Sequence, residues 1–290
     1  MTPDLQAQLR QAIEQASAQL TELSQDAEGD TQVAIQVANT WLSELEAEGS
    51  VTLGVEAQAD ALQDPAARAW MKGWMAQGKD ALPHLQKLHA LGREYAALGL
   101  ADRQVRALRQ SDPQGAVSLG DAVLAWPWSV LCGPQLATLE VTVSETALIG
   151  GRSDGATRMR EALHRSHLQG HWRASFQGAM ALSMAAEQSK LYPRAVELAH
   201  NARSLAVQNQ DAQRYLVAMQ RLMQLAETGG DRVQAYEIAL RAGVSVEALL
   251  GAKGRQMRDE ILAGLELRWG SEAYAQVQGL FLAKQGSAPN

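Results

Sequence analysis

Residues Leu182–Ala202 read LSMAAEQSKLYPRAVELAHNA, and the same pattern recurs on both sides of this stretch. Its centre, Tyr-Pro-Arg-Ala195, has the composition of a helix start, and three other helix starts align with it. The alanines that end the four segments are 40, 39 and 40 residues apart: Ala116, Ala156, Ala195 and Ala235. Self-similarity at a fixed period of roughly 20 to 50 residues is the signature of a repeat protein. The sequence therefore predicts stacked copies of one helical repeat.

The alignment extends to both sides of these anchor alanines. Another alanine stands nine residues before each anchor, and apolar or small side chains stand three and seven residues after it. These positions are Ala107, Ala147, Ala186 and Ala226, then Leu119, Met159, Leu198 and Ile238, then Val123, Leu163, Ala202 and Ala242. Small residues let two helices approach closely, and apolar residues at helical spacing form one face. Each repeat is predicted to be a hairpin of a first and a second helix that buries its apolar face against its neighbours.

The composition favours helices along the whole chain. Ala, Leu, Gln and Met are abundant, and Phe occurs only twice, which is a helix-forming vocabulary. We predict an all-α, antiparallel helix-hairpin solenoid with additional N-terminal and C-terminal helices. Its predicted parts are acidic N-terminal helices at 1–64, repeats at 65–245 and capping helices at 246–290. Single helices are expected at about 3–27, 31–48, 58–78, 81–99, 101–110, 246–267 and 271–284.

The repeats resemble the tetratricopeptide repeat family. The resemblance rests on the alanines at the crossing of the two helices and on helix starts marked by Pro or Asp, over roughly residues 100–245. The repeat is longer than the family's usual length of roughly 34 residues, and most of the aromatic and glycine signature of the first helix is missing. The longer repeat is more similar to the solenoids of large bacterial regulators. This resemblance implies a superhelix that senses a ligand or holds a partner protein.

Charge is distributed unevenly along the sequence. The net charge is −6, but residues 1–64 hold twelve carboxylates against the single base Arg10, and the remaining residues hold 25 bases and 20 acids. The acidic segment is either the solvated face of its helices or a segment that docks on a basic groove of the repeats. The isoelectric point of about 5.6 disfavours nucleic acid as a partner.

Other features limit the location and the chemistry. The single cysteine, Cys132, excludes an internal disulfide and fits a reducing compartment. We find no signal peptide and no apolar run long enough to cross a membrane, so we expect a cytoplasmic protein with no membrane partner. No phosphate-binding or redox motif is present, and no cofactor is expected. No feature indicates an oligomeric state.

Two motifs could carry chemistry. Gly151-Arg-Ser-Asp-Gly155 matches the nucleophile elbow G-x-S-x-G, but that motif has meaning only between a strand and a helix. We interpret it as a turn in which Ser153 or Asp154 caps the next helix. His164, His167 and His171 would share a face of one unbroken helix, as zinc ligands can, but Gly170 is expected to end that helix before His171. We predict neither a catalytic site nor a metal site.

The densest basic cluster is the candidate for partner binding. Arginines in the first helices of such solenoids can hold a carboxylate, and a tryptophan can supply apolar contact area. The residues predicted to bind a partner are Arg158, Arg160, His171, Trp172, Arg173, Gln177 and Arg214. Arg103, Arg106 and Arg109 form a second partial stripe. The alternative for both groups is a solvated basic face.

Aromatic and methionine side chains are expected mainly in the core. We predict packing roles for Trp41, Trp70 and Trp74, and partial exposure for Trp126 and Trp128. Four methionines, Met180, Met184, Met219 and Met223, are spaced by four on first helices; core is the expected place, although methionine surfaces also suit adaptable binding.

We therefore expect a protein–protein interaction module or adaptor, not an enzyme, that holds an acidic partner segment or peptide in a concave groove of its first helices. The alternative is a regulatory protein that senses a peptide or small molecule and acts through a partner.

Overall fold

The structure, a computed structural model, describes residues 60, 62, 64–76 and 78–286 of the 290. Every regular element in these ranges is helical: there are twelve α-helices, two short 3-10 helices and no strand. The prediction of an all-α fold is confirmed. None of these described helices is long and apolar enough to cross a lipid bilayer. The helices predicted at about 3–27 and 31–48 lie outside the described residues, as does nearly all of the predicted segment 1–64.

The chain divides into two compact units, Met1–Gly150 and Gly151–Asn290. The described helices of the N-terminal unit are α4 (Pro65–Met75), η1 (Gly78–Ala81), α5 (Leu82–Ala90), α6 (Glu94–Leu108), α7 (Pro113–Leu124), η2 (Val130–Cys132) and α8 (Gly133–Ile149). Helix α6 packs against α4, α5, α7 and α8. Its buried residues Leu98 and Val105 join Leu85, Val117 and Leu139 in one apolar core.

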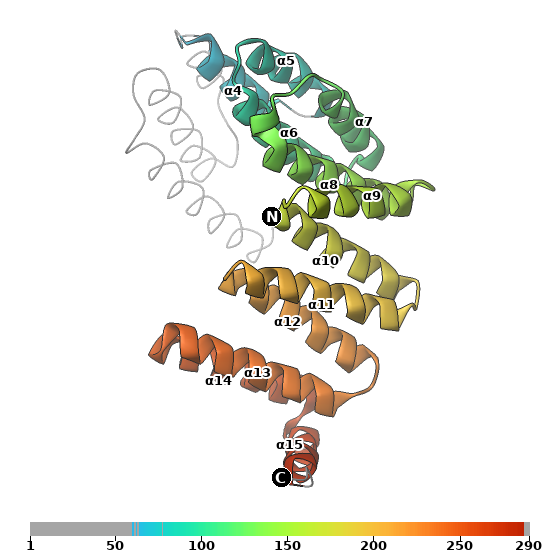
Figure 1. Cartoon of the computed structure of the whole chain (residues 1–290), viewed down its shortest axis with the longest axis vertical. Helices are drawn as coiled ribbons and strands as arrows, with labels where there is room; N and C mark the ends of the chain where they lie inside the picture. The colour runs from blue at the N-terminus through green and yellow to red at the C-terminus, as the bar shows by residue number, and fades with distance from the viewer. Residues whose placement is uncertain (1–59, 61, 63, 77, 287–290) are drawn as a thin grey trace, which may run out of the picture. The chain divides into compact units, whose positions relative to one another are not determined.

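The C-terminal unit is a series of long helices. They are α9 (Gly155–Leu168), α10 (Trp172–Gln188), α11 (Tyr192–Gln208), α12 (Ala212–Thr228), α13 (Arg232–Leu250), α14 (Ala252–Trp269) and α15 (Ser271–Gly286). Each helix packs on the next, and α15 also packs on α13, so that α10 to α13 are stacked in chain order (Figure 1). Packing of each helix on its sequence neighbours is the arrangement of a helical solenoid.

Small side chains allow this close stacking. Ala195, Ala199, Ala202 and Ala206 lie on the buried face of α11 and are fully inaccessible to solvent. These alanines belong to two apolar clusters, and each cluster contains residues of both α10 and α12. The predicted role of alanine at the helix crossings is therefore realised in α11.

In the C-terminal unit, single helices begin at a regular spacing along the sequence, in addition to the repeat of helix pairs. Helices α10, α11, α12 and α13 begin at residues 172, 192, 212 and 232, and a three-residue turn precedes each one. The middle residue of each turn has positive φ: Gly170 (73°), Lys190 (59°), Gln210 (53°) and Gly230 (81°). The third residue of each turn donates its N–H to a carbonyl five residues earlier, as in His171 to Ser166 (2.8 Å) and Asp231 to Ala226 (2.9 Å). These are Schellman motifs, which satisfy carbonyls at a helix end.

Lys190 and Gln210 occupy turn positions that favour glycine. A side chain with a Cβ costs about 1–2 kcal/mol in the left-handed region, and the greater freedom of an unfolded glycine offsets about half of that. Lys190→Gly and Gln210→Gly are each expected to raise the unfolding free energy by about 0.5–1 kcal/mol. Both side chains are exposed, so no packing is lost. Gly230→Lys is the reverse exchange and should lower the thermal unfolding midpoint; a rise would contradict the argument.

Several expected positions differ in the structure. The helix predicted at 81–99 is interrupted, because Gly92 adopts a φ of 69° after α5 and Gly99 lies inside α6. The second anchor of the repeat is Gly155 and not Ala156: Gly155 is buried and Ala156 is exposed. The helix expected near 246–267 begins at Ala252, and residue 245, where we predicted a boundary, lies inside α13.

Candidate functional site

The seven residues predicted to bind a partner all lie in the C-terminal unit, on three helices. Arg158 and Arg160 are on α9, His171 precedes α10, Trp172, Arg173 and Gln177 are on α10, and Arg214 is on α12. The structure brings three of them together around one indole ring, because the guanidinium carbons of Arg173 and Arg214 each lie 5.4 Å from the centre of the Trp172 ring. Both arrangements are cation–π contacts.

Arg214 also holds the start of its own helix. Asp211, the N-cap residue of α12, accepts hydrogen bonds from the backbone N–H of Arg214 (2.8 Å) and from its guanidinium (2.7 Å). The backbone hydrogen bond from Arg214 is the main cause of a lowered pKa of Asp211; burial opposes it, and the guanidinium of Arg214 adds to the lowering. A partner carboxylate at Arg214 would therefore compete with an internal one, whereas Arg173 is exposed.

A polar groove of about 560 Å³ crosses α10 between α9 and α11. Its polar lining residues are Arg160, His164, His167, Ser175, Arg194, Asn201, Ser204 and Gln208, and its apolar ones are Leu163, Ala179, Leu182 and Leu205. Two arginines and two histidines face the groove, and none of these twelve residues is a carboxylate. The volume lies within the range of roughly 300–1,000 Å³ that is usual for ligand pockets.

Both arginines of the groove make only surface contacts. Arg160 donates to the carbonyl of Ala156 (3.3 Å) and to the hydroxyl of Thr157 (3.2 Å). Arg194 pairs with Glu197 at 2.6 Å, and the two side chains are 55% and 56% exposed. Such exposed pairs contribute little to stability. Both guanidinium groups could therefore turn towards a carboxylate in the groove, where charge-assisted hydrogen bonds are stronger than neutral ones.

No protein-family model matches the sequence, and no curated protein matches it.

The walls of the groove come from second helices of the repeats. Helix α10 is a first helix and forms the floor, but α9 and α11 are second helices and supply all the cationic side chains. Of the predicted partner-binding residues, Arg160 lines this groove. Sequence reasoning missed Arg194, although it stands in the anchor segment Tyr192-Pro-Arg-Ala195, because a surface arginine at a helix start carries no distinctive signal.

The three histidines are divided between two helices. Helix α9 ends at Leu168, Gly170 has positive φ, and His171 is the N-cap residue of α10. His164 and His167 line the groove, and His171 does not line it. In the ranges that the structure describes, no three His, Cys, Asp or Glu side chains are grouped so that they could hold a metal ion.

The G-x-S-x-G sequence forms the turn before α9, as predicted, and the element directly before this turn is the helix α8. The predicted cap is absent, because Asp154 stands at the N-cap position without a hydrogen bond to the backbone of α9. Its carboxylate instead accepts from both Nε (2.9 Å) and Nη2 (3.0 Å) of Arg152. These bonds from Arg152 lower the pKa of Asp154.

The arginines of the second stripe make contacts within the N-terminal unit. Arg103 donates to the carbonyl of Trp74 (2.9 Å) and lies 4.0 Å above its ring. Arg106 bonds Thr142 (2.9 Å), and Arg109 pairs with Glu145 (2.9 Å). The three arginines therefore tie the α6 region to α4 and α8, while the side chains of Arg103 and Arg106 remain exposed to solvent.

The two loop tryptophans and the cysteine of the N-terminal unit contact other side chains of that unit. Trp126 and Trp128 are half-buried, as predicted, and both pack around the ring of His89 at 5.4 and 4.6 Å between ring centres. Cys132 is buried beside Glu94, and burial raises the pKa of its thiol. A thiol held in its neutral form is a poor nucleophile.

Proposed function

We propose that this chain is a protein-interaction module and that the groove between α9 and α11 binds an acidic segment of its partner. The observation that supports this most directly is the composition of the groove: Arg160, His164, His167 and Arg194 face it, and none of its lining residues is acidic. The resemblance of the repeats to tetratricopeptide solenoids agrees with a binding role. The single, buried cysteine agrees with our placing the module in the reducing cytoplasm.

The apolar part of the groove sets a second requirement for the bound segment. Ala179 and Leu182 on the floor, with Leu163 and Leu205 on the walls, would contact its aliphatic side chains. Polar groups on α11, among them Asn201 and Gln208, could hydrogen-bond its backbone. The chemistry favours a segment in which Asp or Glu alternates with small apolar residues.

A fluorescein-labelled ten-residue peptide of alternating Glu and Ala tests the proposal by fluorescence anisotropy at low salt. Reversing both groove arginines (Arg160→Glu with Arg194→Glu) is expected to weaken binding at least about tenfold, because two charge-assisted contacts become repulsions. Raising the ionic strength to roughly 1 M should also weaken binding of the unchanged chain.

The matched control is Lys253→Glu with Arg255→Glu on α14, which changes the net charge of the chain equally outside the groove. Both control side chains are exposed. If the groove is the binding site, this control variant should bind the peptide with less than about a twofold loss of affinity. If both double variants keep their helicity and lose affinity for the peptide equally, the peptide binds according to the net charge of the chain and not in the groove. That result would contradict the proposal.

A further inference from the structure

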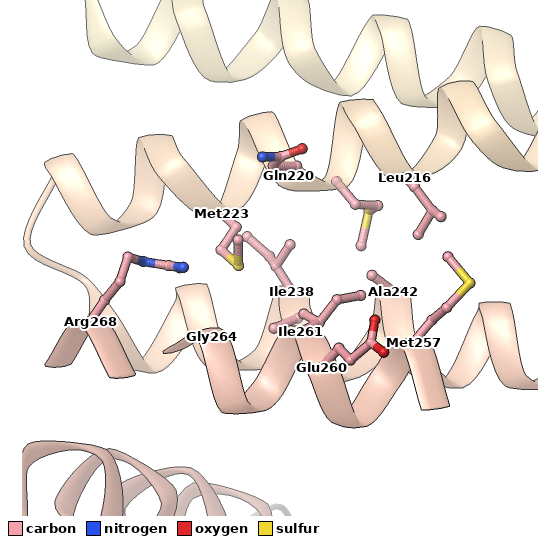
Figure 2. Close-up of a pocket in the computed structure, with 12 residues that line it drawn as sticks. Leu216, Gln220, Met223, Ile238, Ala242, Met257, Glu260, Ile261, Gly264 and Arg268 are labelled. Atoms are coloured by element: carbon pink, nitrogen blue, oxygen red, sulfur yellow. The ribbon is translucent and has the colours of Figure 1, made fainter. Parts of the chain in front are cut away.

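A second cleft in the C-terminal unit is apolar. It has a volume of about 350 Å³ and lies between α12 and α14, with α13 beneath it (Figure 2). Met219, Met223 and Met257 line it together with Ile238 and Ile261. Thioethers are polarisable and adapt to the shape of a ligand. The three polar groups among its twelve lining residues are Gln220, Glu260 and Arg268.

Two features of the sequence keep the cleft open. Gly264 stands on α14 where a side chain would enter the cleft, and a Cβ built there would meet only Nη1 of Arg268, at 3.6 Å. The floor on α13 includes the small residues Ala239 and Ala242. Protein interiors are normally close-packed, so an apolar space between two long helices leaves its lining without contacts that a ligand could supply.

The two ends of the cleft differ. Arg268 lies at one end beside Met223, and Leu216 and Met257 lie at the other (Figure 2). Arg268 is the single cation among the lining residues. Glu260 is eight residues away on α14, which is about 12 Å along a helix. An anionic group is therefore favoured at the Arg268 end, and an apolar chain fits the remainder.

Arg268 is available for such a group. Its Nη2 makes two long contacts with Glu227, at 3.3 and 3.4 Å, and its side chain is 49% exposed. Glu227 has a better donor in the indole N–H of Trp269, at 2.6 Å. Arg268 could therefore leave Glu227 without depriving that carboxylate of its shorter hydrogen bond.

We propose that this cleft binds a single-chain aliphatic carboxylic acid, with the carboxylate on Arg268 and the chain along the three methionines. The volume of about 350 Å³ is at the small end of the range of roughly 300–1,000 Å³ for ligand pockets, so a medium-length acid such as decanoate is the suitable probe. This site would make the chain a sensor of small molecules. It lies on helices other than those of the acidic-segment groove, so either proposal can fail alone.

Isothermal titration calorimetry of the full chain with decanoate, below its micelle concentration, tests the ligand class. Saturable binding of one decanoate per chain is expected. Decanol should bind at least about tenfold more weakly, because a charge-assisted contact is lost, and decyltrimethylammonium should bind no better than decanol. Equal affinities for the acid and the alcohol would overturn the role of the carboxylate. Absence of saturable decanoate binding would overturn the site and would favour an apolar side chain of a partner protein there.

Two pairs of variants test the position of the ligand. Gly264→Leu fills the cleft and should abolish binding, whereas Ala263→Leu adds bulk at the exposed neighbouring position and should leave it unchanged. Arg268→Gln should weaken decanoate at least about tenfold and remove its advantage over decanol. Arg255→Gln, which removes an exposed charge elsewhere on α14, should change neither. Undiminished binding by Gly264→Leu would place the ligand elsewhere and contradict the proposal. The variant with both groove arginines reversed should bind decanoate normally.

Discussion

Arg221→Met is expected to lower the unfolding free energy of the C-terminal unit by about 3 kcal/mol, because it leaves a carboxylate without its partner in a largely buried place. Arg221 is only 7% exposed. Its guanidinium donates to the hydroxyl of Ser183 (3.1 Å), to the carbonyl of Ser183 (2.9 Å) and to Glu187 (2.6 Å). Ser183 in turn donates to the carbonyl of Ala195 (2.8 Å). One side chain of α12 thus fastens α10, which is itself bonded to α11.

A double-mutant cycle separates the charge from the packing. The double variant Arg221→Met with Glu187→Met should lower the unfolding free energy less than Arg221→Met alone does. Apolar side chains of similar volume can replace a buried ion pair. Arg241→Met is the surface control, because Arg241 is 68% exposed and paired with Glu237 on its own helix; its effect should stay below about 0.5 kcal/mol.

Native-state hydrogen exchange of the amides of α10, α11 and α12 is the suitable measurement. It reports the stability of these helices without assuming that both units of the chain unfold together. Exchange in Arg221→Met that is no faster than in Arg241→Met would show that the buried cluster does not hold these helices.

Gly254→Ala is expected to destabilise the same unit by about 2–3 kcal/mol, because the added methyl group overpacks a close helix crossing. A Cβ at Gly254 would lie 2.6 Å from the carbonyl carbon of Val246 and 2.7 Å from Cα of Glu247. Both atoms are backbone of α13, so relief requires movement of a helix and not the rotation of a side chain.

Gly264→Ala on the same helix is the matched control, with an expected change of opposite sign. Its Cβ would meet a single atom at 3.6 Å, at the flexible end of Arg268. Alanine is favoured over glycine within a helix by about 0.8–1 kcal/mol, so this variant should be more stable than the original chain. Thermal unfolding followed by circular dichroism measures both. Similar changes in the two variants would mean that α13 and α14 do not approach at Gly254 as described.

These two glycines show a limit of prediction from the sequence. Gly254 and Gly264 occupy α14 ten residues apart, and local propensity treats them alike. The contact at Gly254 involves the preceding helix, and the space at Gly264 depends on α12. Neither is visible in a pattern along one helix, because both arise from the separation between helices.

The candidate groove was predicted only in part. The basic cluster in the C-terminal unit, which includes the groove residue Arg160, follows from composition and spacing. Arg194, on the next second helix, was not singled out, and Trp172, Arg173 and Arg214 gather in a different place. Which arginines face a groove depends on the rotation of each helix, and one residue changes that rotation by about 100°.

The sequence by itself determined the helical class, the repeat-like order of the helices and most of the alanine positions where helices cross, because these follow from local propensity and from the spacing of small and apolar residues. It also indicated the helix end at Gly170, whose φ of 73° suits glycine. The tertiary structure alone decided that Gly155 and not Ala156 is buried, that Arg221 is internal and Arg194 faces a groove, and that a methionine-lined cleft stays open beside Gly264. These outcomes depend on contacts between helices that are tens of residues apart, and on the exact rotation and separation of each pair, which no single-helix pattern encodes.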